Sequence, residues 1–362
     1  MTVAHLNANR MELSKRDFLK LISTLAAGNA AGCSVVPAAK SGAPSFFKTR
    51  GVVLIPDDLT LVDWPERAHR AGLTTIGLHH SASPKVVIDF VRSERGQTFL
   101  EQCRALGLQV EYELHAMREL LPRSLFAANP EFFRMNEKGE RTPDANFCVH
   151  SGRALEIVAE NALAMAELLR PTTGRYFYWG DDAKAWCQCP KCRGLSESDQ
   201  ALVLENYLLA KLRRIDDRAQ LAHLAYSNTL QPPKQLWPAP GIFLEYAPIN
   251  RRYDMPYHLQ TGPSVKDALD LLDANLEIFD RSSAQVLEYW LDVSRFSKWR
   301  KPAVRLPWNA DVFEADLGTY GKRGLRHVTS FAVFIDADYV SRHGEPVELI
   351  PYGRGLSNWR LK

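Results

Sequence analysis

The chain has 362 residues, of which 24% are charged and 46% hydrophobic, as in an ordinary globular protein. The formal net charge is only +3, and no dense basic run follows the first 45 residues. This balance argues against nucleic acid, or an anionic membrane surface, as a partner.

The N-terminal segment has the pattern of a bacterial export signal. Basic residues precede the apolar run 21–27, which is too short to span a bilayer permanently. Residues 14–20 resemble a twin-arginine signal in which Lys15 replaces the first arginine. Residues 30–33 resemble a lipobox, which implies lipidation of Cys33, although ordinary signal-peptidase cleavage at the same small residues is an alternative. We expect a periplasmic or cell-surface protein, attached to the membrane only through this lipid.

The rest of the chain alternates short apolar strands with helical patterns. After an export signal (1–33) and a flexible linker (34–48), eight strands are predicted, at 51–56, 74–80, 109–115, 175–180, 221–227, 241–247, 285–292 and 328–335. Helices are predicted at 84–106, 152–169, 198–215, 264–279 and, more weakly, 312–322, with Ser151 and Ser198 as N-caps.

This alternation predicts the fold class. Strands that are each followed by a helical crossover indicate a parallel sheet. Eight of them in residues 49–362 favour an α/β protein with a (β/α)8 TIM-type barrel. The stretch after Asp338 has no helical pattern, so we expect an irregular last helix. No Gly-x-Gly-x-x-Gly follows a strand, so a dinucleotide-binding fold gains no support.

Polar residues at the carboxyl ends of the strands are candidates for a functional site, because these ends meet at one mouth of a barrel. A solvated loop position or a helix N-cap is the plainer interpretation of any single one, so the functional interpretation depends on the collective pattern. The candidate catalytic carboxylates are Asp181, Asp182, Glu245, Glu288 and Asp292, and the candidate substrate-binding residues are His79, His80, Glu113, His115, Trp179, Tyr226, Asn228 and Trp290.

Strand alternation predicts which side chains face the barrel interior. In 285–292 the apolar face suits the helix layer, which leaves Glu288 and Asp292 facing inward. These two positions are ~13 Å apart along an extended strand, so only one is expected at the chemistry. In 109–115 the residues on one face are Glu111, Glu113 and His115.

Paired carboxylates across a cleft are what hydrolysis of a glycosidic bond requires. Asp181 or Asp182 on the fourth strand and Glu288 or Asp292 on the seventh lie on opposite sides of the ring, as in many barrel glycosidases by analogy. We predict an exported glycoside hydrolase that acts on an oligosaccharide or polysaccharide and needs no cofactor for catalysis. The alternatives are a non-catalytic saccharide-binding lipoprotein and a uronic-acid lyase with His115 or His80 as base.

A family resemblance rests on the run Trp179-Gly-Asp-Asp-x4-Cys187-x-Cys189-Pro-Lys-Cys192, followed by Ser198-Asp199 and the segment 224–233. This pattern resembles the family called domain of unknown function 4838. The resemblance implies a glycoside-hydrolase-like TIM barrel related in shape to α-glucuronidases and β-hexosaminidases. The family's usual Asn-Asp-Gly aligns Asp181 with the acid, whereas the Gly-Gly-Asp-Glu of β-hexosaminidases aligns Asp182.

The cysteine cluster of Cys187, Cys189 and Cys192 follows directly after the two aspartates. These thiols could hold a structural zinc ion together with Cys148 or a histidine as fourth ligand. A disulfide between one of them and Cys148 is the alternative in an oxidising compartment. A redox-catalytic pair is disfavoured, because the strand–helix context of thioredoxins is missing.

Overall fold

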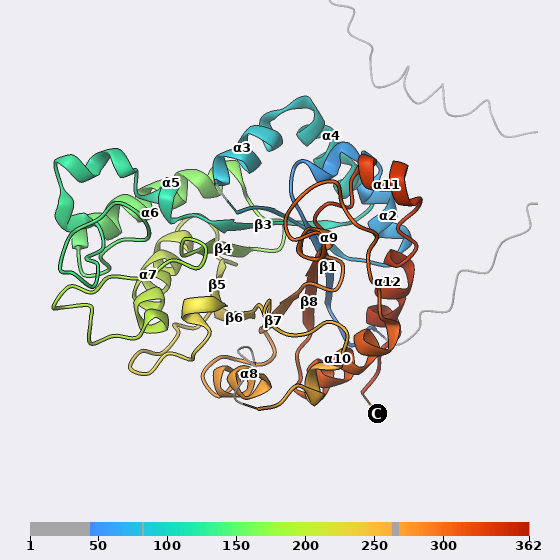
Figure 1. The fold of residues 1–362 in the computed structure, drawn as a ribbon. Helices are drawn as coiled ribbons and strands as arrows, with labels where there is room; N and C mark the ends of the chain where they lie inside the picture. The colour runs from blue at the N-terminus through green and yellow to red at the C-terminus, as the bar shows by residue number, and fades with distance from the viewer. Residues whose placement is uncertain (1–43, 82, 263–267, 362) are drawn as a thin grey trace, which may run out of the picture. The chain divides into compact units, whose positions relative to one another are not determined.

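The computed structural model describes residues 44–81, 83–262 and 268–361. The predicted export signal, most of the linker and Cys33 therefore lie outside the described residues. Eight parallel strands form a closed barrel in which each strand pairs with the next and β8 pairs with β1, which confirms the predicted fold (Figure 1). The strands are β1 (Thr49–Leu54), β2 (Thr75–His80), β3 (Gln109–His115), β4 (Arg175–Trp179), β5 (Gln220–Ala225), β6 (Ile242–Tyr246), β7 (Gln285–Glu288) and β8 (His327–Phe331).

Helices connect the strands around the outside of the barrel (Figure 1). Within the described residues, no helix is both long and apolar enough to cross a membrane. The helices are α2 (Trp64–Arg70), α3 (Pro84–Arg92), α4 (Glu94–Ala105), α5 (Met117–Leu120), α6 (Gly152–Leu168), α7 (Glu197–Leu212), α8 (Leu269–Leu276), α9 (Val293–Phe296), α10 (Ala310–Lys322), α11 (Ala337–His343) and α12 (Leu349–Asn358).

Two serines set helix boundaries that differ from the predictions. The predicted helix 84–106 is divided at Ser93, which has an extended backbone and caps α4 by accepting a hydrogen bond from the Gly96 amide. The N-cap of α7 is Ser196 rather than Ser198, because Ser196 forms a reciprocal capping box with Asp199.

The expected irregular end is wrong, because α11 and α12 follow β8. The sequence of α12 contains Gly353 and Gly355, which are poor helix formers. Packing explains both glycines. A Cβ on Gly353 would lie 1.9 Å from the Ala71 carbonyl oxygen, and one on Gly355 would lie 2.5 Å from the ring of Phe313. Close approach to α2 and α10 therefore compensates for weak intrinsic propensity.

The barrel unit begins at Ser45, four residues before the predicted boundary at 49. Phe47 is fully buried, and its ring lies 5.3 Å from that of Trp359, just beyond α12. The amide of Lys48 donates to the Arg326 carbonyl just before β8. The last residues of the predicted linker are thus part of the folded barrel.

Two long connections stand out on one side of the barrel (Figure 1). The β3–α6 connection contains α5 and the 3-10 turns η2 (Arg123–Ala127) and η3 (Pro130–Phe132). The β4–α7 connection, residues 180–196, carries both candidate aspartates and the three clustered cysteines. These two connections position much of the candidate site.

Candidate functional site

A cavity of about 390 Å³ opens at the carboxyl end of the barrel, and all eight strands or the loops after them contribute to its lining. Strand order places these ends around one mouth, as the sequence predicted. The predicted site residues that line the cavity are His79, His80, His115, Trp179, Asp182, Tyr226 and Asp292.

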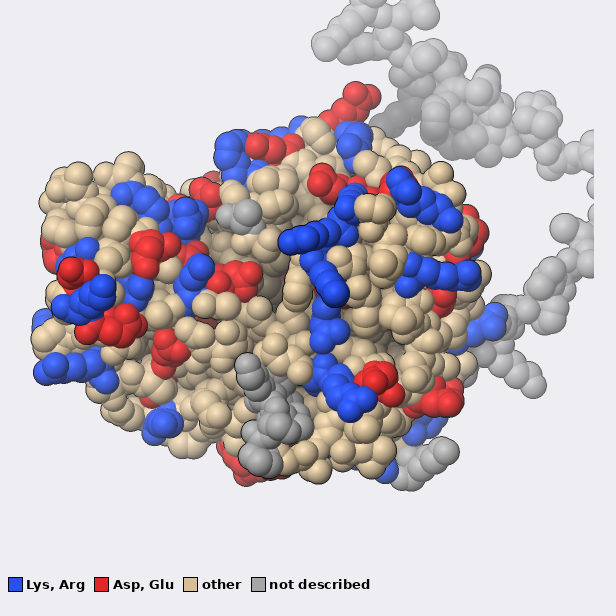
Figure 2. Space-filling model, in the orientation of Figure 1, with Lys and Arg blue, Asp and Glu red and all other residues tan. Residues whose placement is uncertain are grey.

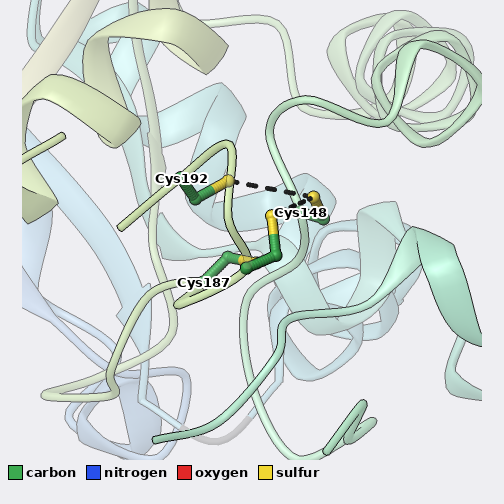
Figure 3. A group of neighbouring side chains, drawn as sticks. Cys148, Cys187 and Cys192 are labelled. Carbon is green, nitrogen blue, oxygen red and sulfur yellow. Dashed lines mark hydrogen bonds between the residues drawn. The ribbon is translucent and has the colours of Figure 1, made fainter. Parts of the chain in front are cut away.

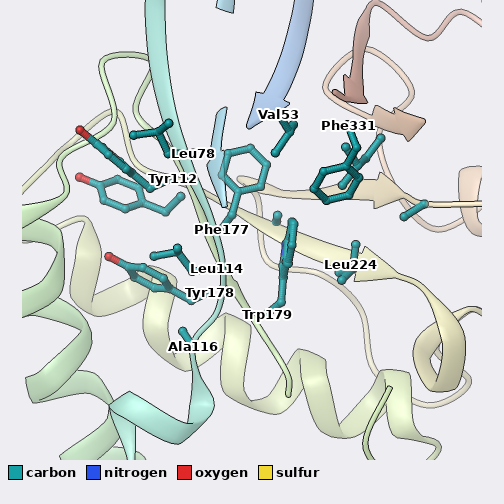
Figure 4. Packing of buried hydrophobic residues seen from close by; sticks show 14 of the residues in the cluster. Val53, Leu78, Tyr112, Leu114, Ala116, Phe177, Tyr178, Trp179, Leu224 and Phe331 are labelled. Carbon is teal, nitrogen blue, oxygen red and sulfur yellow. The ribbon is translucent and has the colours of Figure 1, made fainter. Parts of the chain in front are cut away.

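Three rings that contact one another in edge-to-face or tilted arrangements line the inner part of the cavity. The ring centroids of His79 and His115 are 5.8 Å apart, and each lies within 5.7 Å of the Trp179 centroid. Phe177 and Trp179 project to one side of β4 while Tyr178 projects to the other (Figure 4), so strand alternation places Trp179 inside the barrel.

Both histidines have lowered basicity. Burial lowers the pKa of His79 to about 3, and burial also lowers the pKa of His115. Nδ1 of His79 lies 2.7 Å from the Glu113 carbonyl oxygen, and Nδ1 of His115 lies 2.6 Å from the Gly180 carbonyl oxygen. Since a carbonyl only accepts, each neutral ring carries its proton on Nδ1 and leaves Nε2 unprotonated, as a hydrogen-bond acceptor.

The two adjacent aspartates after β4 have different surroundings. Asp181 accepts from Arg123 Nη2 at 2.8 Å, from the Asn146 amide at 2.7 Å and from the Arg118 amide at 3.2 Å. It lines a smaller hollow beside the main cavity, and its charge is already matched by Arg123. Asp182 lines the main cavity, is 45% exposed, and has Oδ1 3.8 Å from His115 Nε2. Asp182 is therefore the aspartate available to a bound molecule.

Asp292 brings a second carboxylate to the cavity, just after β7. It is the N-cap of α9: Oδ1 accepts from the Ser294 hydroxyl at 2.6 Å and from the amides of Ser294 and Arg295 at 3.1 and 3.3 Å. Burial outweighs these hydrogen bonds and raises the pKa of Asp292 to about 6.

The predicted inward orientation of Glu288 is wrong. Its carboxylate is fully buried outside the cavity lining and accepts from Tyr253 at 2.9 Å, from Arg251 and from Tyr320 of α10. Trp290, also predicted at the site, instead donates to Asp316 Oδ2 at 3.0 Å and packs against α10.

The error arose because barrel strands are buried on both faces, so apolarity does not identify the outer face. The residues of this region that face inward are Gln285, Leu287 and Tyr289.

Glu113 and Glu245 do not line the cavity. They are fully buried among the inward-facing side chains, as is Glu111, whose partner is Arg175 at 3.8 Å. Glu245 accepts from Trp179 Nε1 at 2.9 Å and from Gln285 Nε2 at 3.0 Å, and burial raises its pKa to about 8.

The Glu113 carboxyl group makes fewer hydrogen bonds than that of Glu245. Its carboxyl oxygens have no hydrogen-bond partner among the described residues, and burial raises its pKa well above the ordinary value. Gly77 provides the space, since a Cβ there would lie 2.6 Å from Glu113 Oε1. Arg175 is the cation beside the three acids Glu111, Glu113 and Glu245. These four residues form a buried charged cluster beneath the cavity.

Sequence reasoning missed four aromatic residues of the cavity, which are Tyr289, Trp299, Phe331 and Phe334. Tyr289 was assigned to the outer face with the other apolar residues of its strand. Trp299 lies in the loop after α9, is 65% exposed, and follows Lys298 with both residues at positive φ (54° and 56°). The feature of the sequence that could have pointed to Trp299 is a tryptophan that lies outside every predicted strand and helix. Asn228, by contrast, lines the smaller hollow beside Asp181 rather than the main cavity.

Backbone strain is concentrated in the loops at this end of the barrel. Among the described residues, those with positive φ that are not glycine all follow the carboxyl ends of strands: Asn146, Ala183, Ser227, Lys298, Trp299 and Phe334. Such conformations are costly and persist where the surrounding structure imposes them, often at functional sites.

The surface of the face drawn in Figure 2 is hollowed near its centre. Acidic side chains border this hollow on one side, and a column of Lys and Arg side chains lies on the other. Elsewhere on this face the two charge types are interspersed, in line with the near-neutral composition.

A family model described as "Domain of unknown function (DUF4838)" matches residues 50–297. The chain belongs to this family. The matched span of this DUF4838 protein runs from β1 through α9 and includes every residue that the sequence suggested for the site. No curated protein matches the chain.

Two solved structures that are similar to this DUF4838 protein are glycoside hydrolases. A β-N-acetylhexosaminidase from Bacteroides fragilis NCTC 9343 shares 11% identity with a TM-score of 0.51, covering 85% of this chain and 65% of that one. Gan42B, a GH42 β-galactosidase from G. stearothermophilus, shares 12% identity with a TM-score of 0.52, covering 86% and 57%. The chain thus spans less than two thirds of either relative, and the likeness establishes a glycosidase-like TIM-barrel fold.

Proposed function

We propose that this protein is a glycoside hydrolase in which Asp182 and Asp292 are the paired catalytic carboxylates. The observation that carries the proposal is that these are the carboxylates lining the main cavity among the described residues, one after β4 and one after β7. Glycosidic bond cleavage needs such a pair at the bond. The glycosidase-like fold supports the same reaction class.

The environments of the two carboxylates suggest different roles. A general acid must hold its proton at the working pH, and burial raises the pKa of Asp292 to about 6. Asp292 is therefore assigned to protonate the leaving oxygen. Asp182, half-exposed beside His115, is assigned to attack the anomeric carbon or to activate water. This assignment places the acid after the seventh strand, whereas the analogy drawn from the sequence placed it on the fourth.

Aromatic side chains suit a saccharide. The cavity is lined by Trp179, Tyr226, Tyr289 and the exposed Trp299, which offer flat apolar surfaces for sugar faces. The neutral histidines add acceptors for hydroxyl groups. The substrate is proposed to be an oligosaccharide or polysaccharide, with no cofactor in the reaction.

The test is a screen of the purified protein against aryl glycosides and native glycans, with Asp182→Asn and Asp292→Asn compared with the exposed control Asp338→Asn. Each cavity variant should lose ~10²–10⁴-fold in turnover, and the control should lose nothing. Asp292→Asn should be impaired less on substrates with good leaving groups, and should lose the pH limb near 6 at which activity falls as the acid ionises. Saccharide binding without turnover, unaffected by either variant, would establish a binding protein instead.

A uronic-acid lyase is a second candidate, favoured by His115. Its neutral ring, with the proton held on Nδ1 by Gly180, presents Nε2 at the cavity as a base for proton abstraction. A lyase would yield an unsaturated product detectable by ultraviolet absorbance, and His115→Gln would abolish it.

We also propose that residues 1–33 direct export and that Cys33 carries the lipid anchor, which would place the enzyme in the periplasm or at the cell surface. The motif in residues 30–33 supports this proposal. In the native host, the wild-type protein should fractionate with membranes and Cys33→Ser should not. A cytoplasmic wild-type protein with its first residues intact would refute it.

A further inference from the structure

Four cysteines from two different loops converge at one buried point. Cys148 comes from the β3–α6 connection, while Cys187, Cys189 and Cys192 come from the β4–α7 connection. All four are buried free thiols, and their sulfur atoms lie within 4.8 Å of one another. Figure 3 shows the Cys148 side chain pointing across the gap between the loops towards Cys192.

Two of the sulfur–sulfur distances match those of a tetrahedral metal site, and all four sulfurs lie within 4.8 Å of one another. Cys148 Sγ is 3.8 Å from both Cys189 Sγ and Cys192 Sγ. In a tetrahedron whose centre lies ~2.3 Å from each sulfur, neighbouring sulfurs are about 3.8 Å apart. A disulfide would instead need a separation of about 2.05 Å. Because one cysteine is equally close to two others, no single pair is favoured for oxidation.

The surroundings suit thiolates. The Met135 amide points at Cys187 Sγ at 3.3 Å, and Arg141 Nη1 lies 3.8 Å from the same sulfur. His150 Nδ1 lies 3.2 Å from Cys192 Sγ, within reach of an N–H···S hydrogen bond. Four thiolates around a divalent ion leave two negative charges, and N–H donors and a guanidinium of this kind offset such charge in the outer shell of metal sites.

We propose that Cys148, Cys187, Cys189 and Cys192 bind one structural zinc ion. All four coordination positions are filled by protein sulfur, so the ion has no open position for chemistry. Tetrahedral sulfur coordination in a buried site is the geometry that zinc prefers.

The zinc would join the two loops that hold the aspartates. Asn146, two residues before Cys148, accepts from the Asp181 amide at 2.8 Å through its side chain and donates to Asp181 Oδ2 through its own amide. The Cys187 amide donates to Gln200 Oε1 of α7. The ion therefore closes a ring of contacts around residues 181–187 and fixes the backbone that presents Asp182.

The experiment is metal analysis of the full chain purified without chelator, with Cys148→Ser, Cys189→Ser and the matched control Cys103→Ser. Cys103 is a buried thiol in α4, outside the cluster. We expect about one zinc per chain in the wild type and in Cys103→Ser, and at least a fivefold loss in the two cluster variants. Cobalt substitution should add sulfur-to-metal charge-transfer bands in the wild type that Cys148→Ser lacks.

Chelation should lower the melting temperature of the wild type and of Cys103→Ser, and should expose residues 180–196 to proteolysis. The wild-type metal content decides the proposal even if the cluster variants fail to fold. A wild-type chain with no bound zinc, with iron in its place, or with a disulfide involving Cys148 would overturn it.

Discussion

Replacing Glu245 by glutamine should change how the stability of the protein depends on pH. Burial raises the pKa of this carboxyl from 4.5 to about 8. A folded-state pKa above the unfolded one means that the stabilisation is fully present below pH 4.5 and is lost as pH rises through 8. The difference of about 3.5 units, at ~1.36 kcal/mol each, corresponds to about 5 kcal/mol between the two limits.

The amide in Glu245→Gln cannot ionise, so the variant should not show this loss. The glutamine at position 245 can still accept a hydrogen bond from Trp179, but its NH2 group then faces the NH2 group of Gln285, and two donors cannot bond to each other. The Gln285 side chain must therefore rotate, and its oxygen loses the hydrogen bond that it accepts from Arg175. One such bond is worth about 1 kcal/mol. At pH 5 the wild type has already lost about 0.8 kcal/mol, so the two effects nearly cancel and the variant should be about as stable as the wild type; at pH 9 it should be roughly 4 kcal/mol more stable.

Urea unfolding followed by circular dichroism at both pH values, at constant ionic strength, measures this difference. The matched control is Glu277→Gln, an exposed residue paired with Arg281 on the surface, which should follow the wild type within about 0.5 kcal/mol. If Glu245→Gln stays below the wild type by the same margin at pH 5 and pH 9, the carboxyl is already ionised in the folded protein and the reasoning is refuted.

Further predictions concern the loops and the last helix. Arg123→Met should leave Asp181 without its cation, lower stability by about 1–3 kcal/mol and increase proteolysis within residues 180–196; unchanged cleavage would show that the other hydrogen bonds of Asp181 suffice. Gly353→Ala should lower the midpoint of thermal unfolding, since its Cβ would lie 1.9 Å from the Ala71 carbonyl oxygen, whereas Gly318→Ala, with open space in α10, should be neutral or raise stability by up to about 1 kcal/mol. Equal effects of the two alanines would contradict the packing account of α12.

The fold could be predicted because strands and helical crossovers produce periodic patterns of apolar residues in the sequence, and helix-capping residues reinforce these patterns. β3 was predicted to the residue, and the shared face of Glu111, Glu113 and His115 is confirmed. The last helix could not be predicted, because its stability comes from glycine-mediated contact with distant residues rather than from its own sequence. The split at Ser93 depended in the same way on a cap that periodicity does not reveal.

The site was predictable as a set of strand ends but not in the role of each carboxylate. His79, His115, Trp179, Asp182 and Asp292 do line one cavity. Which side of a doubly buried strand faces inward depends on partners supplied from elsewhere in the chain, as Arg251 is for Glu288 and Arg175 is for Glu111. Those pairings join residues far apart in sequence, and no local pattern encodes them.

The closure of the barrel through β1 and β8 has a consequence for how the chain folds. Thr49 is bonded to His327, 278 positions later, and Tyr352 of α12 donates to the Gly51 carbonyl across 301 positions. Contacts of such long sequence separation form slowly, because a large loop must close before they stabilise anything. Until then the β1 edge and the Phe47 region would be exposed to pairing with other chains. The half-formed barrel should therefore be the species most prone to aggregation and most dependent on chaperones.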